Sequence, residues 1–222
     1  MHPLVSDKLV DRMGLWCERV SARLSAGKPA LFIDRDGVIV EEMHYLARPE
    51  DVRVIRSAAA AIRAANQLGM CVVVVTNQSG IGRGYYGWQE FERVQERIIE
   101  ELAGDGAYLD VVMACAYHDE ASGQLAIADH AWRKPNGGMI TSAAQMLDTD
   151  LPNSLMVGDK RIDLEAGRSA GVGTGILVRT GHGAAEATRF DPTILRPMRV
   201  SIENDISGIE PWLRTVRDRF QT

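Results

Sequence analysis

Three kinds of feature are scarce in this 222-residue sequence. Its three cysteines, Cys17, Cys71 and Cys115, are scattered and odd in number, which argues against a disulfide framework and favours a reducing, cytoplasmic location. No apolar run approaches the roughly 20 residues that a membrane helix needs, and the charged stretch 7–12 leaves no apolar core for a signal peptide. Basic residues are not in excess: the net charge of −5 argues against a general binder of nucleic acid or of anionic membranes.

What is present is the composition of a globular protein. With 45% hydrophobic and 25% charged residues, the chain can bury the core of one domain, which we place at residues 30–222. Residues 1–29 precede the first clear strand and are expected to form an N-terminal helical arm. The apolar residues that suggest an amphipathic helix there are Leu9, Met13, Trp16, Val20 and Leu24.

From residue 30 onward, apolar strand patterns alternate with helical patterns. Strands are expected at 30–33, 71–76, 111–116, 154–158 and 174–179, and helices at 57–68, 88–103, 139–147, 163–170 and 206–219. This alternation predicts an α/β fold, a Rossmann-like and mostly parallel sheet with helices on both faces. The spacing between strands leaves no room for a separate cap domain. The segment 184–205 is assigned no element, because two prolines interrupt it.

Two carboxylates stand at the end of the first of these strands, in Asp34-Arg35-Asp36-Gly37. Carboxylates one residue apart leave a strand end on the same side, and glycine lets the chain turn sharply. Such a pair can divide one reaction, with one group attacking while the other transfers protons. Taken alone, the pattern is equally typical of a solvated turn.

Three further segments place polar groups at comparable positions. Thr76 ends the second strand, Asp159 follows the strand 154–158, and Arg133-Lys134 precedes the helix 139–147. Ligands of open parallel sheets bind at the carboxyl ends of the strands. An acid pair, a hydroxyl, a lysine and a further acid, in this order, resemble the four motifs of the haloacid dehalogenase superfamily of phosphatases. The resemblance covers about residues 30 to 180.

That resemblance implies a role for each motif residue. Asp34 would be the nucleophile that forms an aspartyl-phosphate, and Asp36 the acid and base. Thr76 would bind a phosphoryl oxygen, and Lys134 would neutralise the phosphoryl charge. Mg²⁺ would be the cofactor, held by Asp34, the backbone carbonyl of Asp36, and Asp159. Each residue also has an ordinary structural reading: Thr76 as a strand residue, Asp159 as a helix cap, and Lys134 as a solvated loop residue.

A finer resemblance is to the family of heptose-bisphosphate and histidinol-phosphate phosphatases, carried by the runs 34–37, 76–84, 133–135 and 158–160. It implies a substrate pocket formed by Glu42, Tyr45, Asn77, Gln78, Ser79, Arg133 and Lys160. The function expected is hydrolysis of a sugar phosphate. The leading substrate is heptose 1,7-bisphosphate, for lipopolysaccharide precursor synthesis. The alternatives are a histidinol-phosphate phosphatase, a 3′-phosphatase of nucleic-acid ends, and a binding module without activity. The lack of a basic stripe argues against the nucleic-acid phosphatase.

The sequence departs from this family where relatives carry a zinc clip. The matching positions are Cys115, Tyr117, His130 and Trp132, and only the first is an unchanged ligand. We therefore do not expect structural zinc, although Cys115, His118 and His130 remain possible ligands of some metal. The partner expected is a small phosphorylated metabolite, with no nucleic acid and no membrane, and with the protein as a monomer or weak homodimer.

Overall fold

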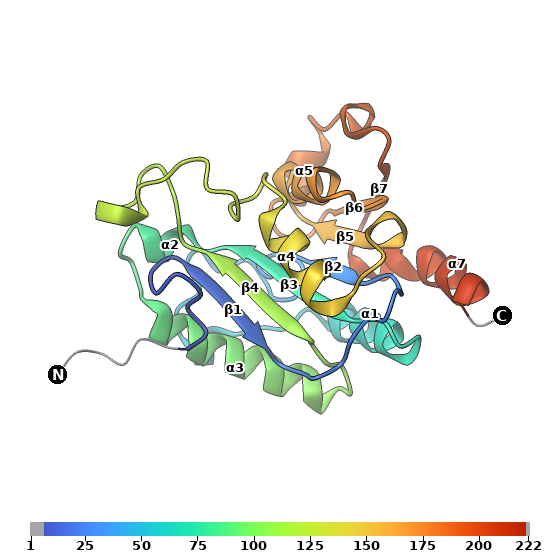
Figure 1. Ribbon diagram of the computed structural model, residues 1–222, viewed down its shortest axis with the longest axis horizontal. Coiled ribbons are helices and arrows are strands. Elements are labelled where there is room, and N and C mark those ends of the chain that lie inside the picture. Colours follow the sequence, from blue (N-terminus) through green and yellow to red (C-terminus); the bar gives the residue numbers. More distant parts are fainter. Residues whose placement is uncertain (1–6, 221–222) are drawn as a thin grey trace.

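The computed structural model describes residues 7–220 (Figure 1). Its strands are β1 (Leu15–Arg19), β2 (Leu31–Ile33), β3 (Val72–Asn77), β4 (Val111–Cys115), β5 (Leu155–Gly158), β6 (Thr174–Val178) and β7 (Arg199–Glu203). Its α-helices are α1 (Arg56–Gln67), α2 (Ser79–Gly82), α3 (Trp88–Gly104), α4 (Gly138–Leu147), α5 (Arg161–Ala170), α6 (Gly183–Ala187) and α7 (Glu210–Phe220). Short 3₁₀ helices lie at 49–51, 123–125, 151–153, 192–195 and 206–209.

The seven strands form one sheet in the order β1-β4-β3-β2-β5-β6-β7. All neighbouring pairs are parallel except β1 and β4. The chain starts the parallel sheet at β2, builds β3 and β4 to one side, and then returns to build β5, β6 and β7 on the other. The order therefore reverses between β2 and β5, which is where open α/β sheets bind ligands.

Alternate residues of the central strands pack on opposite faces of this sheet. Val72 and Val74 lie in one buried cluster with α1, α3 and α7, whereas Val73 and Val75 lie in the other with α4 and α5. Figure 1 shows helices on both sides of the sheet. Side chains of successive strand residues point to opposite faces, so an all-apolar strand must be covered twice. The predicted mostly parallel sheet with helices on both faces is confirmed.

The prediction of a helix within residues 1–29 is wrong where the structure describes that segment. Residues 15–19 form β1, which pairs antiparallel with β4 and covers the edge of the sheet. The turn before it is held by Asp11 Oδ1, which accepts backbone N–H groups of Met13, Gly14 and Leu15 at 2.9–3.0 Å. Pairing with a distant strand outweighs the helical spacing of the apolar residues, a tertiary effect that local periodicity does not contain.

The loops in which a cap domain could be inserted contain little regular secondary structure. Between β2 and α1 the described chain forms one 3₁₀ helix, and between β4 and α4 one more. The segment 184–205, for which the sequence predicts no element, contains most of α6, a 3₁₀ helix and the edge strand β7. The helix predicted at 206–219 begins with a 3₁₀ turn at 206–209 and continues as α7. None of the helices within residues 7–220 combines the length and the apolar character needed to cross a bilayer.

Candidate active site

The predicted site residues gather at one edge of the sheet, where the carboxyl ends of β2, β3 and β5 meet. A cavity of about 230 Å³ lies there. Its lining includes all the predicted residues except Arg133 and Asp159, namely Asp34, Asp36, Glu42, Tyr45, Thr76, Asn77, Gln78, Ser79, Lys134 and Lys160. Residues from five separate segments of the sequence thus share one small polar cavity, the concave kind of site in which small molecules bind.

Lys134 lies at the centre of this arrangement. Its ammonium group contacts Asp34 Oδ1 at 2.8 Å and Asp163 Oδ1 at 2.7 Å, and it donates to the Val75 carbonyl oxygen at 2.8 Å. The Lys134 side chain is only 2% exposed. The contacts with Asp34 and with the Val75 carbonyl are hydrogen bonds, and the contact with Asp163 is an ion pair. Lys134 therefore fixes the position of Asp34 within the cavity.

The charges of these buried groups support one another. Burial alone would raise the pKa of Asp34, but the positive charges of Lys134 and Lys160 outweigh it and lower that pKa. Burial alone would lower the pKa of Lys134, but Asp163 and Asp34 outweigh it and raise that pKa. Asp34 is consequently held as a carboxylate and Lys134 as a cation, the states that nucleophilic attack on a phosphate ester requires.

Three buried carboxylates form a set that fits a divalent cation. Ligand atoms of Asp34, Asp159 and Asp163 lie within 4.8 Å of one another. Burial, together with the negative charge of Asp34, raises the pKa of Asp159 to about 7. Asp159 Oδ1 is buried and accepts no hydrogen bond from the described residues. An unpartnered buried oxygen in an oxygen-rich, negatively charged cluster is the environment that Mg²⁺ neutralises.

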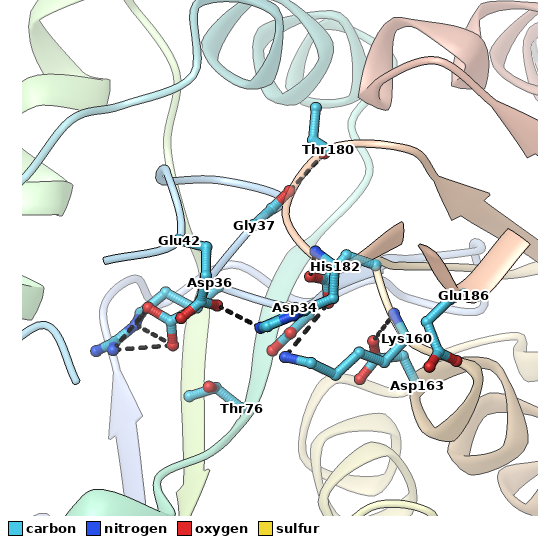
Figure 2. Close-up of polar contacts among 12 residues, drawn as sticks. Asp34, Asp36, Gly37, Glu42, Thr76, Lys160, Asp163, Thr180, His182 and Glu186 are labelled. Atoms are coloured by element: carbon cyan, nitrogen blue, oxygen red, sulfur yellow. Dashed lines mark hydrogen bonds and ion pairs between the residues drawn. The ribbon is translucent and has the colours of Figure 1, made fainter. Parts of the chain in front are cut away.

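Asp36 lines the same cavity and belongs to a second network of hydrogen bonds; Figure 2 labels it together with Asp34 and Thr76. Nη2 of the buried Arg35 donates to Asp36 Oδ1 at 2.9 Å, and Gln78 Nε2 donates to Asp36 Oδ2 at 3.2 Å. Tyr86 donates its hydroxyl proton to Gln78 Oε1 at 2.5 Å. The carboxylate of Asp36 is therefore oriented by a charged residue and an amide whose own positions are fixed by packing and hydrogen bonds.

Gln78 also orients Thr76, because its Nε2 donates to Thr76 Oγ1 at 2.9 Å. A hydroxyl oxygen that accepts this bond keeps its own proton free to donate elsewhere. Asn77 acts on the opposite wall: its amide accepts from the backbone N–H of Lys134 and donates to the Lys134 carbonyl, both at 3.0 Å. Two residues predicted to bind substrate thus also position the hydroxyl and the lysine.

Arg133 is the predicted substrate residue that does not line the cavity. Its Nη1 donates to the carbonyl oxygen of Tyr117 at 2.9 Å, so the guanidinium braces the loop between β4 and α4. Burial lowers the pKa of Arg133. The side chain stays partly exposed in the described structure, and contact with a substrate remains a prediction.

The positions that match a zinc clip are held by other contacts. The rings of Tyr117 and His130 stack with centroids 4.2 Å apart, and Tyr117 donates to Asp11 Oδ2 at 2.6 Å. His130 Nδ1 accepts from the backbone N–H of Trp132 at 3.1 Å. His118 contacts Arg83 through Nε2 at 3.2 Å. The N-terminal turn that carries Asp11 is therefore part of what fixes this loop.

Elemental analysis of the purified protein is expected to find no stoichiometric zinc, because Tyr117 and Trp132 replace two of the ligands and the imidazole of His130 is already used in stacking and hydrogen bonding. Tyr117→Phe, which removes the hydroxyl bonded to Asp11, should instead destabilise the fold by about 1–2 kcal/mol in urea denaturation. About one zinc per chain, lost together with folding when Cys115 or His130 is replaced, would contradict this expectation.

Four residues of the site were not identified from the sequence. Asp163 lies four residues after Asp159, and that spacing at a helix start was the available signal. Arg35 stands inside the acid motif, yet a charged residue in a turn is normally exposed. Tyr86 and His182 come from loops, and no local pattern indicates that folding brings them to the cavity.

Comparison with known proteins agrees with this geometry. A family model described as HAD-hydrolase-like matches residues 131–200. A D-glycero-β-D-manno-heptose-1,7-bisphosphate 7-phosphatase of Mesorhizobium japonicum is 44% identical over 203 residues, 91% of this chain and 88% of that protein.

Two crystal structures extend the comparison. One from Mesorhizobium loti has a TM-score of 0.84 and 39% identity, covering 95% of this chain and 96% of that chain. The D,D-heptose 1,7-bisphosphate phosphatase of B. bronchiseptica, complexed with magnesium and phosphate, has a TM-score of 0.72 and 27% identity, covering 84% of this chain and 98% of that chain. This chain belongs to the heptose-bisphosphate phosphatase family of haloacid dehalogenase-like hydrolases.

Proposed function

We propose that this protein removes the 7-phosphate of D-glycero-D-manno-heptose 1,7-bisphosphate, for lipopolysaccharide precursor synthesis, through an aspartyl-phosphate on Asp34. The observation that carries the proposal is the buried ion pair of Asp34 with Lys134, in a cavity that Asp36 also lines. The likeness to the Mesorhizobium japonicum enzyme supports the choice of substrate. The three free cysteines support a cytoplasmic location. The proposal includes a small metabolite as partner, with a monomer or weak homodimer as its assembly.

In the first half of the proposed reaction, a carboxylate oxygen of Asp34 attacks the phosphorus of the 7-phosphate. Lys134 offsets the charge of the transferred group, and the hydroxyl proton of Thr76 is free to bind a phosphoryl oxygen. Asp36 protonates the leaving C7 oxygen as its bond to phosphorus breaks. The sugar leaves as an alcohol, and the phosphoryl group stays on Asp34.

In the second half, Asp36 takes a proton from water as the water oxygen attacks the phosphorus of phospho-Asp34. The acyl-phosphate bond breaks, inorganic phosphate leaves and the Asp34 carboxylate returns. Asp34, the backbone carbonyl of Asp36, and Asp159 would hold Mg²⁺, with Asp163 close by. When bound there, the ion offsets the combined negative charge of the nucleophile and the phosphate.

A substrate screen tests this function. Phosphate release is measured with both anomers of heptose 1,7-bisphosphate, with histidinol phosphate and with a 3′-phosphorylated oligonucleotide. One anomer of the bisphosphate should exceed the other substrate classes in kcat/KM by about 100-fold or more, because a site that hydrogen-bonds the groups of its own substrate discriminates strongly against substrates that lack them. A higher kcat/KM for histidinol phosphate or for the oligonucleotide would overturn the choice of substrate.

Removal of divalent cations with EDTA should abolish turnover, and Mg²⁺ should restore it. Ca²⁺ should inhibit, because its larger and looser coordination shell displaces the nucleophile from the phosphorus. The measurement is the steady-state rate with p-nitrophenyl phosphate in metal-stripped buffer with each cation. Full activity in that buffer would contradict the proposed cofactor.

Arg133→Ala should raise KM for the bisphosphate, by a factor equivalent to about 1.5–3 kcal/mol, if its guanidinium reads a group beyond the transferred phosphate. The same change should leave turnover of p-nitrophenyl phosphate nearly unaltered, because that ester offers no second group. Arg133→Lys is the matched control, which keeps the charge and loses the planar fork. Equal losses on both substrates would show that Arg133 acts only by bracing the loop at Tyr117.

A further inference from the structure

The turn that follows β6 encloses the carboxylate of Asp159. The backbone N–H of His182 donates to Asp159 Oδ2 at 2.8 Å. Asp159 is 0% exposed, and its other oxygen, Oδ1, has Lys160 Nζ at 3.7 Å but accepts no hydrogen bond within the described chain. One oxygen of this carboxylate is therefore tied to the protein backbone while the other is left without a hydrogen-bond partner.

Two glycines allow the turn to approach this closely. Gly37, after the acid pair, and Gly181 both have positive φ, +81° and +55°. A Cβ atom on Gly37 would lie 2.5 Å from Asp159 Oδ2, and one on Gly181 would overlap with the same oxygen and with the Gly37 backbone. No side chain larger than hydrogen fits at either position without moving Asp159.

A side-chain hydrogen bond joins the same two segments. Thr180 donates its hydroxyl proton to the carbonyl oxygen of Gly37 at 2.5 Å. Figure 2 shows this bond linking the turn after β6 to the turn after β2, with His182 and Asp34 lying nearby. The segment that carries the nucleophile and the segment that encloses Asp159 are thus held together by Thr180, Gly181 and His182.

We propose that residues 180–182 are a clamp that fixes the Asp159 carboxylate, with Oδ2 bound to the His182 N–H and Oδ1 presented to a divalent cation. This rests on the proposed cation site of Asp34 and Asp159. A carboxylate that is already oriented loses no rotamer freedom when the cation binds, so the clamp raises cation affinity. Groups that orient a metal ligand typically change affinity by about 10–100-fold.

If residues 180–182 act as a clamp, neighbouring variants should differ in cation affinity in a way that a loss of fold stability alone would not produce. Gly181→Ala displaces Asp159 Oδ2, and Thr180→Val removes the bond to Gly37. Thr180→Ser keeps that hydroxyl. Gly171→Ala, at the C-terminal end of α5, is a matched control, since its φ is +92° yet no atom lies within 4 Å of the added Cβ.

The experiment titrates metal-stripped full-length protein with Mn²⁺, an octahedral stand-in for Mg²⁺, and follows the free ion by electron paramagnetic resonance. Circular dichroism on the same samples reports folding. Gly181→Ala should bind Mn²⁺ about 10–100-fold more weakly than the wild type, and Thr180→Val several-fold more weakly. Thr180→Ser and Gly171→Ala should stay within about twofold of the wild type, even though Gly171→Ala also places a side chain at a positive φ and should lower stability.

Folded Gly181→Ala and Thr180→Val proteins that bind Mn²⁺ as tightly as the wild type would overturn the clamp. If Gly181→Ala does not fold, Thr180→Val against Thr180→Ser decides the question alone. A wild type that binds no Mn²⁺ would overturn both the cation site and the clamp. A wild type that binds Mn²⁺, with the expected order among the variants, but does not hydrolyse the bisphosphate would overturn the proposed substrate and support the clamp.

Discussion

Asp34→Asn is expected to abolish turnover, lowering kcat by at least about a thousandfold on every phosphate ester, because an amide cannot form the acyl-phosphate. Lys134 keeps its contacts with Asp163 and with the Val75 carbonyl in this variant, so the fold should persist. The measurement is kcat with p-nitrophenyl phosphate, with circular dichroism as the test of folding.

The matched comparison for Asp34→Asn is Asp36→Asn, which should slow both half-reactions without removing the covalent route. The amide keeps only one acceptor oxygen, so one of the Arg35 and Gln78 donors loses its present bond and the variant should be less stable than the wild type, with circular dichroism as the test of folding. An Asp34→Asn protein that keeps more than about a tenth of wild-type activity, free of deamidated enzyme, would show that another residue is the nucleophile.

Lys134→Met should impair both catalysis and stability. Two carboxylates, those of Asp34 and Asp163, would lose their shared buried cation, at a cost of about 3–5 kcal/mol in the free energy of unfolding. Loss of charge compensation at the transferred phosphate should lower kcat by about 10²–10³-fold, on the bisphosphate and on p-nitrophenyl phosphate alike. Urea denaturation and steady-state kinetics measure the two effects.

Lys160→Met is the control for this second prediction. Its side chain is 34% exposed and lies 3.7 Å from Asp159 Oδ1, so its loss should change stability by less than about 1 kcal/mol. A Lys134→Met protein that is as stable as the wild type, or that keeps full activity on p-nitrophenyl phosphate, would contradict the central position given to Lys134.

The sheet and the position of the site were predictable because they follow from local patterns. Apolar runs ending in Asp34, Thr76 and Asp159 identify parallel strands, and the carboxyl ends of such strands meet at one edge. The N-terminal strand was not predictable, because the spacing of Leu9 and Trp16 fits a helix, while the pairing that decides the structure involves β4, about 100 residues away.

Within the site, the sequence does not predict the contacts between residues that are distant along the chain, nor which charged residues become buried. The chemistry of Asp34 and Lys134 is indicated by residue type, but nothing in the sequence shows that Arg35 is buried against Asp36. His182 stands between two glycines and reads as an ordinary turn. Its position beside Asp159 depends on how β6 places the turn after it, which is set by the packing of the whole sheet.

The covalent intermediate on Asp34 is the central claim, and chemical trapping tests it most directly. Asp36→Asn enzyme is mixed with p-nitrophenyl phosphate, whose good leaving group needs little protonation, so the first half-reaction proceeds while attack by water stalls. Borohydride then reduces any acyl-phosphate to an alcohol, and mass spectrometry locates it. We predict a burst of about one p-nitrophenol per site, with homoserine at position 34. Reduction at another residue, or continued turnover with no burst and no reduced residue, would contradict the account.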